Sequence, residues 1–359
     1  MPSSTSTTRP EPKPLAVTLG DPCGIGPETI ARAWAEAPEA VRGAFVAGDL
    51  GVMRRAMALL PPAHQRPLQA ITVPAQALAL GPEVLPVLQV LPEPLPELPW
   101  GQVDARAGRL AGRCVQWAAR AALRGEVAAL VTAPLHKQAL QAAGDPFDRY
   151  PGHTELLQDE AARHAGVPLA QMPVRMMLAS DELRTVLVSI HVALRQALDA
   201  ITHDNVLQTL RITHQALSRS LGRAPHMAVA GVNPHAGEGG QFGREEIEVL
   251  GPALAQARDE GLWVSGPIAP DTVFMRARQA PGHPGEFDVV VAMYHDQGLI
   301  PVKYLGLDQG VNVTLGLPLV RTSPDHGTAM DIAGRGVASA ASLVHALQWA
   351  RRLSADRCD

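Results

Sequence analysis

The sequence predicts an α/β protein built on a largely parallel sheet with helices on its faces. Short apolar runs of strand length alternate with longer amphipathic segments from one end of the chain to the other. Hydrophobic residues make up 46% of the 359 residues and charged residues 18%, so the chain can bury a large core. No apolar run approaches the roughly 20 residues that a membrane-spanning helix needs.

The expected strands and helices alternate in chain order. The strands are Leu15–Thr18, Ala128–Thr132, Arg175–Leu178, Thr185–Ile190, Met227–Val232, Val289–Met293 and Val311–Leu315. The helices are one that opens at Pro27, then Arg106–Leu123, Leu198–Leu217, Glu245–Asp259 and Ala338–Leu353. Pro27 suits the first turn of a helix, where its missing N–H would have no partner in any case. Parallel pairing is expected because helices between strands supply the crossover connections that it requires.

Three segments lack this pattern. Residues 1–14 are rich in Ser, Thr and Pro and predict a disordered tail. The stretch Leu85–Pro99 is dense in Pro and Leu and predicts an extended surface connection. Residues Arg276–Phe287 combine Pro and Gly with no periodicity, which predicts a loop.

Composition excludes several classes of protein. There are 31 Lys and Arg residues against 35 Asp and Glu, a net charge of −4, which argues against the basic face of a nucleic-acid-binding protein. The first residues hold no apolar stretch of the kind found in signal peptides. The three cysteines, Cys23, Cys114 and Cys358, are scattered and odd in number, which favours a reducing compartment. We therefore expect a cytoplasmic protein with neither nucleic acid nor membrane as a partner.

A glycine-rich turn, GDPCGIGPE, follows the first expected strand and opens a helix, where phosphate-binding loops often lie. It fits neither common fingerprint. The dinucleotide pattern needs a third glycine where Thr29 stands, and the Walker pattern needs a Gly-Lys pair that is absent. Glu28 in the first helical turn would also repel a pyrophosphate. A tight structural turn and a ligand loop both remain open.

Three histidines share a position relative to expected strands. His191 ends the run TVLVSI, His235 follows MAVAGV across Asn-Pro, and His295 follows VVVAMY. Open α/β sheets bind their ligands at the carboxyl ends of strands. Imidazole is a common ligand of zinc and similar metals, and three protein ligands with an open position are the pattern of catalytic sites. The three residues are too far apart for a local zinc motif, so only the fold can bring them together.

Polar residues cluster around the last of these histidines. Asp296 and Gln297 adjoin His295, and the cations Lys303 and Arg321 follow with Asn312 between them. Lys and Arg with an amide are a plausible cradle for phosphate or carboxylate. The alternative is a set of ordinary surface groups.

Seven motifs in order give the chain a family resemblance. They are GDPCGIGPE, VTAPLHK, PGHTE, NPHAGEGG, GPIAPDT, YHDQGLIPVKY and GVNVTLGLPLVRTSPDHGTAMDIAGRG, which together extend from Gly20 to Gly336. The chain resembles the 4-hydroxythreonine-4-phosphate dehydrogenase family of pyridoxal phosphate biosynthesis. The segment DHGTAMDIAGRG is also similar to the cofactor loop of isocitrate and isopropylmalate dehydrogenases. The resemblance departs modestly at Asp21 and Cys23, where relatives commonly have Glu and Ala.

The resemblance implies a two-domain α/β/α sandwich of the isocitrate/isopropylmalate dehydrogenase type with its active site in the interdomain cleft. Residues 15–140 with about 316–359 would form the cofactor domain, and residues 141–315 the metal and dimer domain. The implied site residues group by role: Asp271 and Lys137 catalytic; His153, Thr154, Lys303, Asn312 and Arg321 substrate-binding; His326, Gly327 and Asp331 cofactor-binding; and His191, His235 and His295 metal-binding. The implied assembly is a homodimer whose active site lies at the interface, with metal ligands from both subunits.

The implied reaction is the NAD(P)-dependent oxidation of 4-phosphooxy-L-threonine. One divalent metal per site (Zn, Mg or Co) would lower the pKa of the substrate's C3 hydroxyl. The resulting 2-amino-3-oxo acid would lose CO2 to give 3-amino-2-oxopropyl phosphate, and Asp271 is the first choice of base, ahead of Lys137. Other readings stay open: the same fold acting on erythronate or threonate 4-phosphate or on a dihydrodiol, a three-histidine metal hydrolase, and a ligand-binding protein without catalysis.

Overall fold

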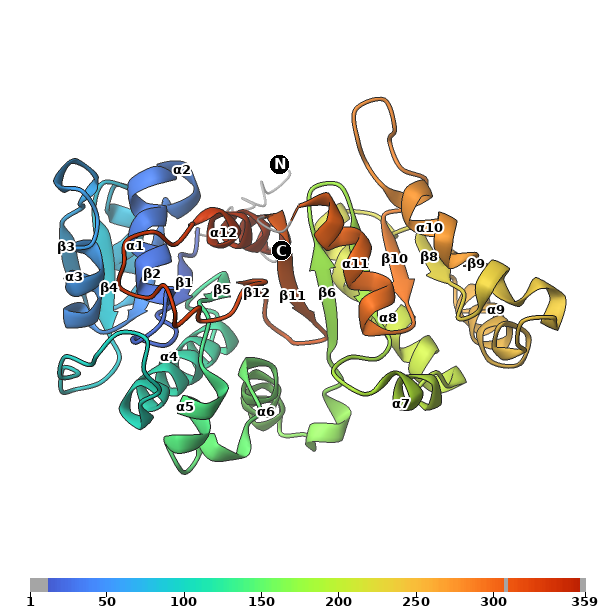
Figure 1. The fold of residues 1–359 in the computed structure, drawn as a ribbon, viewed down its shortest axis with the longest axis horizontal. Helices are drawn as coiled ribbons and strands as arrows, with labels where there is room; N and C mark the ends of the chain where they lie inside the picture. Colours follow the sequence, from blue (N-terminus) through green and yellow to red (C-terminus); the bar gives the residue numbers. More distant parts are fainter. Residues whose placement is uncertain (1–11, 307–308, 356–359) are drawn as a thin grey trace, which may run out of the picture.

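The computed structural model describes residues 12–306 and 309–355 (Figure 1). Within that part of the chain, twelve strands form one sheet in the order β3-β4-β2-β1-β5-β12-β11-β6-β7-β10-β8-β9. The strands are β1 (Leu15–Thr18), β2 (Ala44–Gly48), β3 (Leu68–Ile71), β4 (Leu85–Gln89), β5 (Ala129–Thr132), β6 (Arg175–Ala179), β7 (Arg184–Leu187), β8 (Met227–Ala230), β9 (Val264–Ile268), β10 (Val289–Ala292), β11 (Val311–Leu315) and β12 (Arg321–Pro324).

The sheet has two parallel parts joined by an antiparallel centre. Strands β3, β4, β2, β1, β5 and β12 are parallel, and so are β7, β10, β8 and β9. Between them, β11 pairs antiparallel with β12 and β6, and β6 pairs antiparallel with β7. The expected parallel sheet is therefore confirmed in both halves and wrong at the centre, where short connections join sequential strands.

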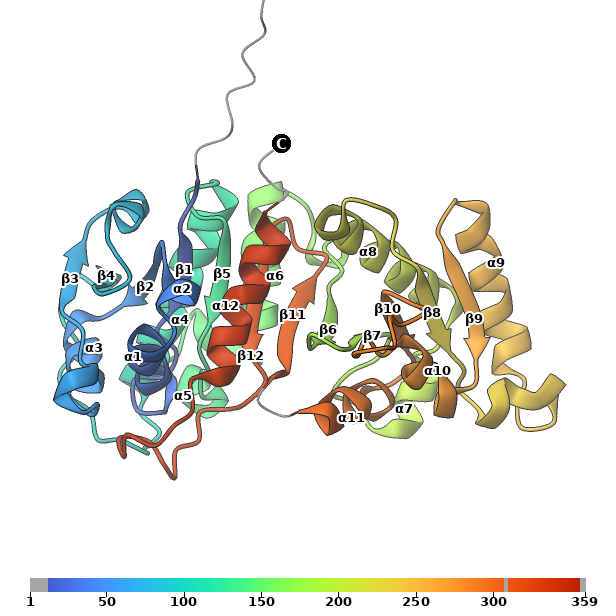
Figure 2. The ribbon, with the colours of Figure 1, turned by 90° about the horizontal axis from the view of Figure 1, so that it is seen from above.

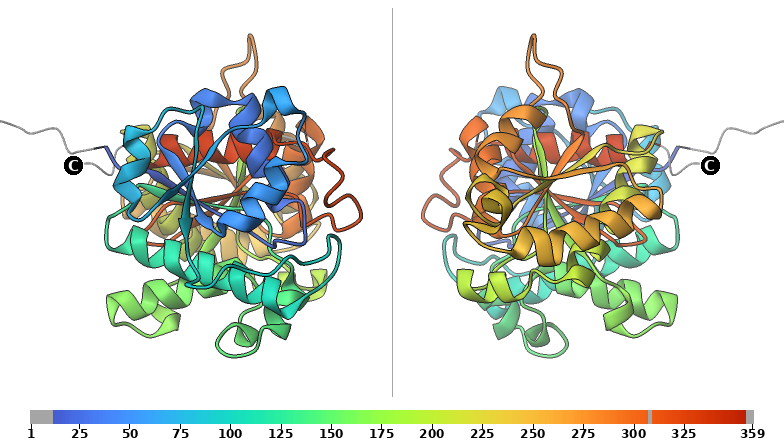
Figure 3. Two further views of the ribbon diagram at one scale, coloured as in Figure 1. Left: turned by 90° about the vertical axis from the view of Figure 1, so that its left-hand side faces the viewer. Right: turned by 90° about the vertical axis from the view of Figure 1, so that its right-hand side faces the viewer.

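Helices cover both faces of the sheet, which is seen from above in Figure 2 and from each end in Figure 3. They are α1 (Gly26–Glu36), α2 (Pro38–Val41), α3 (Leu50–Met57), α4 (Ala105–Leu123), α5 (Lys137–Ala142), α6 (His153–Ala165), α7 (Leu194–Asp199), α8 (His203–Leu221), α9 (Gly251–Asp259), α10 (Pro270–Ala277), α11 (His295–Leu305) and α12 (Ala341–Ser354). Strand side chains alternate between the two covers. Val17 of β1 joins the cluster that includes Leu343 of α12, whereas Ala16 joins the one that includes Val115 of α4.

The C-terminal segment returns to the N-terminal half of the sheet. Strand β12 pairs parallel with β5, and Thr322 Oγ1 donates to Ala346 O of α12 over 2.7 Å. The division into domains at residues 141 and 316 stays a prediction, because one continuous sheet passes through both proposed domains.

Several predicted boundaries differ from the structure. The expected surface connection Leu85–Pro99 is wrong at its start, since Leu85–Gln89 is the largely buried strand β4 between β2 and β3. Its alternating apolar residues outweigh the single N–H that Pro86 lacks. The expected helix Leu198–Leu217 is interrupted, because Thr202 caps a new helix by accepting a hydrogen bond from Asn205 N.

Two further segments need smaller corrections. The expected helix Glu245–Asp259 begins with a π-helical turn, Glu246–Leu250, before α9. The expected loop Arg276–Phe287 starts after α10 ends at Ala277 and projects from the sheet (Figure 1). Of the expected disordered tail, residues 1–11 lie outside the described residues, and Pro14 O accepts a hydrogen bond from Ala128 N. No helix in the described ranges is long and apolar enough to cross a membrane.

Candidate active site

Three neighbouring parallel strands place the predicted metal ligands at one edge of the sheet. His191 lies shortly after β7, His295 opens α11 directly after β10, and His235 lies in the turn Pro234–Gly240 after β8. The strand order β7-β10-β8 brings their carboxyl ends together. This is the position at which open α/β sheets bind ligands.

The His191 and His295 rings lie side by side. Their centroids are 5.6 Å apart and their planes are inclined by 44°. Val188 N donates to Ala292 O and Ser189 Oγ to Met293 O, both over 2.9 Å, and these bonds hold the two strand ends together. Burial lowers the pKa of His191, as do the nearby charges of His295 and Lys137. The lowered pKa favours the neutral form of His191, which is the form that binds metals.

The pair borders a cavity of about 260 Å³ that is lined by residues from the end of β7 to α7 and from the start of α11. Its other walls are mostly apolar and include Ile190, Val192, Leu194 and Tyr294. Asp296 Oδ1 lies 2.7 Å from His295 Nδ1. A carboxylate on one ring nitrogen fixes the tautomer and leaves the other nitrogen free for a metal.

His235 stands apart from this pair. Its side chain is exposed, and its own turn is held by Glu246, whose Oε1 accepts hydrogen bonds from Val232 N and Asn233 N over 2.7 and 2.8 Å. In residues 12–306 and 309–355, no three or more His, Cys, Asp or Glu side chains are grouped so that they could hold a metal. The structure thus brings together two of the three predicted ligands. The two imidazoles fit a divalent ion as part of its ligand set.

Arg321 is a buried cation without a counter-ion. Its side chain is 4% exposed. Nε and Nη2 donate to Thr132 Oγ1 over 3.0 and 2.8 Å, and Nη1 donates to Thr314 Oγ1 over 3.1 Å. Burial lowers its pKa to about 10, and no ion pair with another described residue compensates the charge. A buried guanidinium satisfied only by hydroxyls is a site for an anion.

Two other predicted substrate residues, His153 and Asn312, are related to this guanidinium by charge and by strand register. His153 is the first residue of α6, followed by Thr154, and burial together with the Arg321 charge lowers the His153 pKa well below its usual value. Asn312 lies opposite Ser323, and Thr314 opposite Arg321, in the β11–β12 ladder. Asn312 and Arg321 therefore share one face of the sheet.

Lys303 has a partner that the sequence did not predict. Its Nζ lies 2.8 Å from Asp325 Oδ2, so α11 is tied to the segment after β12. A substrate anion would have to compete with this carboxylate. The two predicted bases differ in position: the Lys137 charge reaches His191, whereas Asp271 is an exposed residue of α10, which packs against the turn carrying His235.

The predicted cofactor residues follow β12 and pack against the glycine-rich turn. Ile25 N donates to Thr328 O over 3.0 Å, and Ala338 N donates to Glu28 Oε1 over 2.7 Å. The turn is thus a packing partner of the segment that holds His326, Gly327 and Asp331, and Glu28 anchors that segment. Gly327 and Asp331 are exposed, while His326 Nε2 is buried and has no hydrogen-bond partner among the residues that the structure describes. An unsatisfied nitrogen beside an open loop fits a polar ligand such as a dinucleotide.

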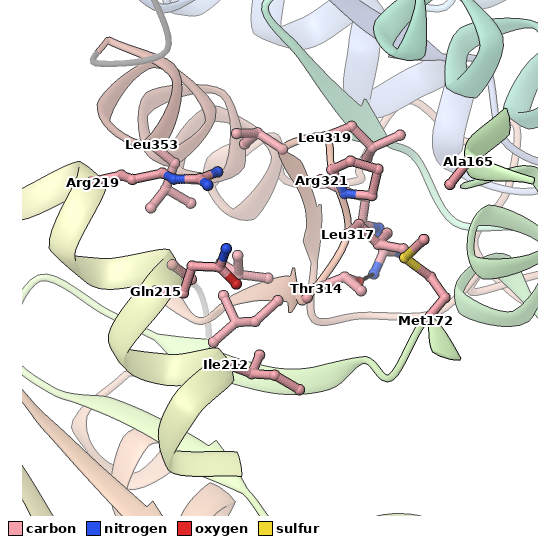
Figure 4. A pocket seen from close by; sticks show the side chains of 16 residues that line it. Ala165, Met172, Ile212, Gln215, Arg219, Thr314, Leu317, Leu319, Arg321 and Leu353 are labelled. Atoms are coloured by element: carbon pink, nitrogen blue, oxygen red, sulfur yellow. Dashed lines mark hydrogen bonds between the residues drawn. The ribbon is translucent and has the colours of Figure 1, made fainter. Parts of the chain in front are cut away.

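A larger cavity, of about 660 Å³, lies beyond the β11–β12 turn (Figure 4). Thr314 and Arg321 lie on one side of it, and Gln215 and Arg219 of α8 face them across the space. No predicted site residue other than Arg321 lines it.

The motifs did not predict a role for two of their acidic residues, Asp21 and Glu155. Asp21 is fully buried, and burial raises its pKa to about 6. Glu155, in the first turn of α6, raises the pKa of both Arg321 and His191 through its charge. Both lie within quoted motifs, but only their place in the fold distinguishes them from structural carboxylates.

The fold is an α/β fold. Paired imidazoles at its strand ends and a buried guanidinium without a counter-ion are features of an enzyme active site. Residues 40–350 match the family model described as pyridoxal phosphate biosynthetic protein PdxA, and the chain belongs to this family.

Named relatives support the same family assignment. The chain is 50% identical, over 343 residues and 95% of each chain, to 4-hydroxythreonine-4-phosphate dehydrogenase of Beijerinckia indica. It is 45% identical, over 96% of its length and 100% of the relative, to D-threonate 4-phosphate dehydrogenase of Salmonella typhimurium. The crystal structure of 4-hydroxythreonine-4-phosphate dehydrogenase from Klebsiella pneumoniae superimposes with a TM-score of 0.83 at 42% identity, covering 97% of this chain and 99% of that one. The chain is accordingly an oxidoreductase of the dehydrogenase type.

Proposed function

We propose that the protein is an NAD(P)-dependent 4-phosphooxy-L-threonine dehydrogenase of pyridoxine 5'-phosphate biosynthesis. The observation that carries the proposal is the 50% identity, over 95% of both chains, to a relative of that name. In this reaction the C3 hydroxyl is oxidised to a ketone. The 2-amino-3-oxo acid then loses CO2 and gives 3-amino-2-oxopropyl phosphate.

His191 and His295 would hold the divalent metal, with His235 as third ligand. When bound, the metal would lower the pKa of the substrate hydroxyl. Because His235 is exposed and apart from the pair in one chain, we infer that it completes the site of a second copy in a homodimer. Exposed apolar side chains near the pair, Val192 and Leu194 at 50% and 59% exposure, support burial against such a copy.

Binding and orientation fall to the chain's own residues. Arg321, with Lys303 after it leaves Asp325, would bind the anionic ends of the substrate, while Asn312, His153 and Thr154 add hydrogen bonds. His326, Gly327 and Asp331 would bind NAD(P), which would supply the hydride acceptor for the oxidation. The hydroxyl proton would pass to Lys137 or Asp271. Lys137 lies close enough to His191 for its charge to lower the pKa of that imidazole.

One assay tests the proposal. Protein, Zn²⁺, Mg²⁺ or Co²⁺, and NAD+ or NADP+ are mixed with 4-phosphooxy-L-threonine, and the absorbance of the reduced cofactor is followed. A metal-dependent rate that chelator abolishes is the expected result. The second candidate substrate is D-threonate 4-phosphate, because a 45% identical relative carries that name. No reduction with either substrate would contradict the proposal.

A further inference from the structure

The turn that carries His235 has an unusual backbone. Its residues from His235 to Gly239 all have positive φ angles, of 52°, 52°, 81°, 43° and 66°. Three of them, His235, Ala236 and Glu238, have a Cβ atom, and a residue with a Cβ atom rarely adopts this left-handed conformation. Backbone strain of this kind persists only where the surrounding structure holds it, and it is concentrated at functional sites. The turn therefore needs a group that holds it in place.

The direction of the His235 ring depends on this backbone. The side chain is exposed, and within the described ranges 12–306 and 309–355 it makes no hydrogen bond. Its ring centroid lies 6.1 Å from that of Phe242, which is another exposed residue. Because neither hydrogen bonds nor burial orient the ring, relaxation of the turn to right-handed angles would carry the imidazole to a different position.

A buried carboxylate, that of Glu246, holds the start of the turn. Glu246 is 5% exposed. Its Oε1 atom accepts hydrogen bonds from Val232 N and Asn233 N over 2.7 and 2.8 Å, and its Oε2 atom accepts one from Asn233 Nδ2 over 3.0 Å. Val232 and Asn233 immediately precede the turn Pro234–Gly240. Both oxygens of one carboxylate thus fix the segment through which the chain leaves β8.

Two glycines leave room for this carboxylate. A Cβ atom at Gly237, in the middle of the turn, would lie 2.7 Å from Glu246 Oε2, and one at Gly231 would lie 3.2 Å from Oε1. Glu246 also begins the π-helical turn Glu246–Leu250, a form of helix that is frequent at functional sites. The carboxylate therefore lies against the inside of the turn, between its first residues and Gly237.

The same segment is tied to α11. Nε2 of the buried Gln297 donates to Gly231 O over 2.7 Å, and Gln297 Oε1 accepts from Met293 N over 2.7 Å. The end of β8 is thus fixed relative to the end of β10. Glu246 then determines the course of the chain between this fixed end and His235.

We propose that Glu246 is a positioning residue for metal binding: its carboxylate holds the left-handed turn and so directs His235 to the metal of the second copy. This inference rests on the proposed function, in which His235 is the third ligand, and it adds the group on which that ligand depends. The alternative is that Glu246 stabilises the fold around β8 without any effect that passes through His235.

Zn²⁺ titration of the full chain by calorimetry tests the proposal without turnover. Glu246→Ala removes the hydrogen bonds to Val232 and Asn233, and it should lower the Zn²⁺ affinity roughly 10–100-fold, the usual effect of losing a group that orients a metal ligand. Glu246→Gln can keep an oxygen acceptor at the place of Oε1 and should lose less. Glu248→Gln is the matched control, because it removes an exposed carboxylate that pairs with Arg244, and its affinity should stay within about threefold of the original.

A pair of glycine variants separates the carboxylate from the strain of the turn. Gly237→Ala and Gly239→Ala both place a Cβ atom on a left-handed residue, with φ angles of 81° and 66°. The new Cβ atom would press on Glu246 Oε2 in the first variant, whereas at Gly239 nothing lies within 4 Å of it. Gly237→Ala should therefore lower the Zn²⁺ affinity as Glu246→Ala does, and Gly239→Ala should leave it nearly unchanged. These two variants decide the question if Glu246→Ala does not fold.

The dependence on His235 is tested directly. If Glu246 acts through His235, Glu246→Ala should cost little further Zn²⁺ affinity in a protein that already carries His235→Ala. The visible absorption of bound Co²⁺ depends on the number and arrangement of its ligands, so Glu246→Ala and His235→Ala should shift it in the same way. Cooperative thermal unfolding checks that each variant is folded.

The contrary outcomes are distinct. Unchanged Zn²⁺ affinity in folded Glu246→Ala, or an equal cost of that change with and without His235, would overturn the positioning role and leave the proposed function intact. Equal losses in Gly237→Ala and Gly239→Ala would also overturn it, because any distortion of the turn would then suffice. Unchanged Zn²⁺ affinity and Co²⁺ absorption in His235→Ala would instead contradict the metal site of the proposed function, and the inference with it.

Discussion

The imidazole rings of His191 and His295 lie 5.6 Å apart at the ends of two neighbouring parallel strands, β7 and β10. No local motif joins these residues, so the register of the sheet sets their separation. The Ser189–Met293 hydrogen bond, from Oγ to the backbone carbonyl, reinforces that register beside the pair. The geometry of any metal bound here therefore depends on strand pairing.

Loss of either ring should reduce metal binding strongly. Changes to groups that merely orient metal ligands typically cost 10–100-fold in affinity, so His191→Ala and His295→Ala should each cost at least about 100-fold. Zn²⁺ titration by calorimetry measures the effect. His203→Ala is the control, because His203 is a histidine on α8 that pairs with Asp204. Unchanged Zn²⁺ affinity in either site variant would remove that residue from the metal site.

Mixed dimers should reveal which ligands come from different subunits. His191 and His295 are adjacent within one chain, so a refolded mixture of His191→Ala and His295→Ala should stay inactive. A mixture of His235→Ala and His295→Ala should instead regain about a quarter of the activity, because half the dimers are mixed and each has one intact site. Recovery in the first mixture, or none in the second, would contradict the proposed sharing of ligands.

Arg321→Lys should not restore the ligand affinity that Arg321→Ala loses. The guanidinium makes three hydrogen bonds to Thr132 and Thr314, and a lysine at this buried position keeps the charge but not the planar fork. The affinity of either variant for O-phospho-L-homoserine, a substrate analogue that lacks the C3 hydroxyl, should fall roughly 10–100-fold, whereas the affinity for NADH, measured by its fluorescence, should change little. Full ligand affinity in folded Arg321→Lys would show that charge alone suffices there.

Asp325→Asn should tighten the binding of phosphate. In the structure the Asp325 carboxylate holds the Lys303 ammonium at 2.8 Å, and both side chains are partly open to solvent. Removal of this competitor should lower the Kd for inorganic phosphate by up to about tenfold, with a weaker effect at high salt because such pairs are screened. Asp181→Asn, which frees Arg352 elsewhere on the surface, is the matched control. A Kd that is unchanged or raised in Asp325→Asn would show that the ion pair does not restrain Lys303.

Among the described residues, the apolar pattern of the sequence predicted seven strands and missed β2, β3, β4, β9 and β12. Strands such as Val289–Ala292 are unbroken apolar runs, which a buried parallel strand requires. Strand β9 escaped prediction because Gly266 and Pro267 break its apolar run, and β12 because its sequence, RTSP, has no apolar run. Pairing with neighbouring strands stabilises both. The break before α8 is decided by the Thr202 cap.

The candidate site was predictable where motifs marked it. His191 and His295 could be named from their places after strands, and the structure puts them side by side. The partner of Lys303 could not be named, since Asp325 reaches it only through the return of the chain after β12. Glu155 reads as an ordinary residue of a first helical turn. Its charge raises the pKa of Arg321 on β12, a relationship that only the fold creates and no short sequence pattern encodes.

Asp21 should make the stability of the protein depend on pH. Burial raises its pKa from 3.8 to about 6, and the nearby charge of Asp104 adds to this, against the opposing effects of the Cys23 N–H and of His136. The folded state therefore holds this proton more tightly than the unfolded state. The stabilising contribution is fully present below pH 3.8 and is lost as the pH rises to about 6. The resulting loss in the free energy of unfolding is at most about 3 kcal/mol, because one pKa unit corresponds to about 1.36 kcal/mol.

Asp21→Asn removes the titration while its amide oxygen can still accept the hydrogen bond from Cys23 N, which is 2.8 Å in the structure. Urea unfolding of both proteins from pH 4 to 8 measures their free energies of unfolding. Relative to the original protein, the free energy of unfolding of the variant should rise by up to about 3 kcal/mol between pH 4 and 7, and no further above pH 7. If the amide itself changes the stability, it does so equally at every pH. The change in the difference between the two proteins with pH is therefore unaffected. Asp181 is an exposed residue paired with Arg352. For Asp181→Asn, the difference in free energy of unfolding from the original protein should hardly change with pH. Parallel pH profiles for Asp21→Asn and the original protein would mean that Asp21 stays ionised throughout, so that its burial is compensated in the folded state.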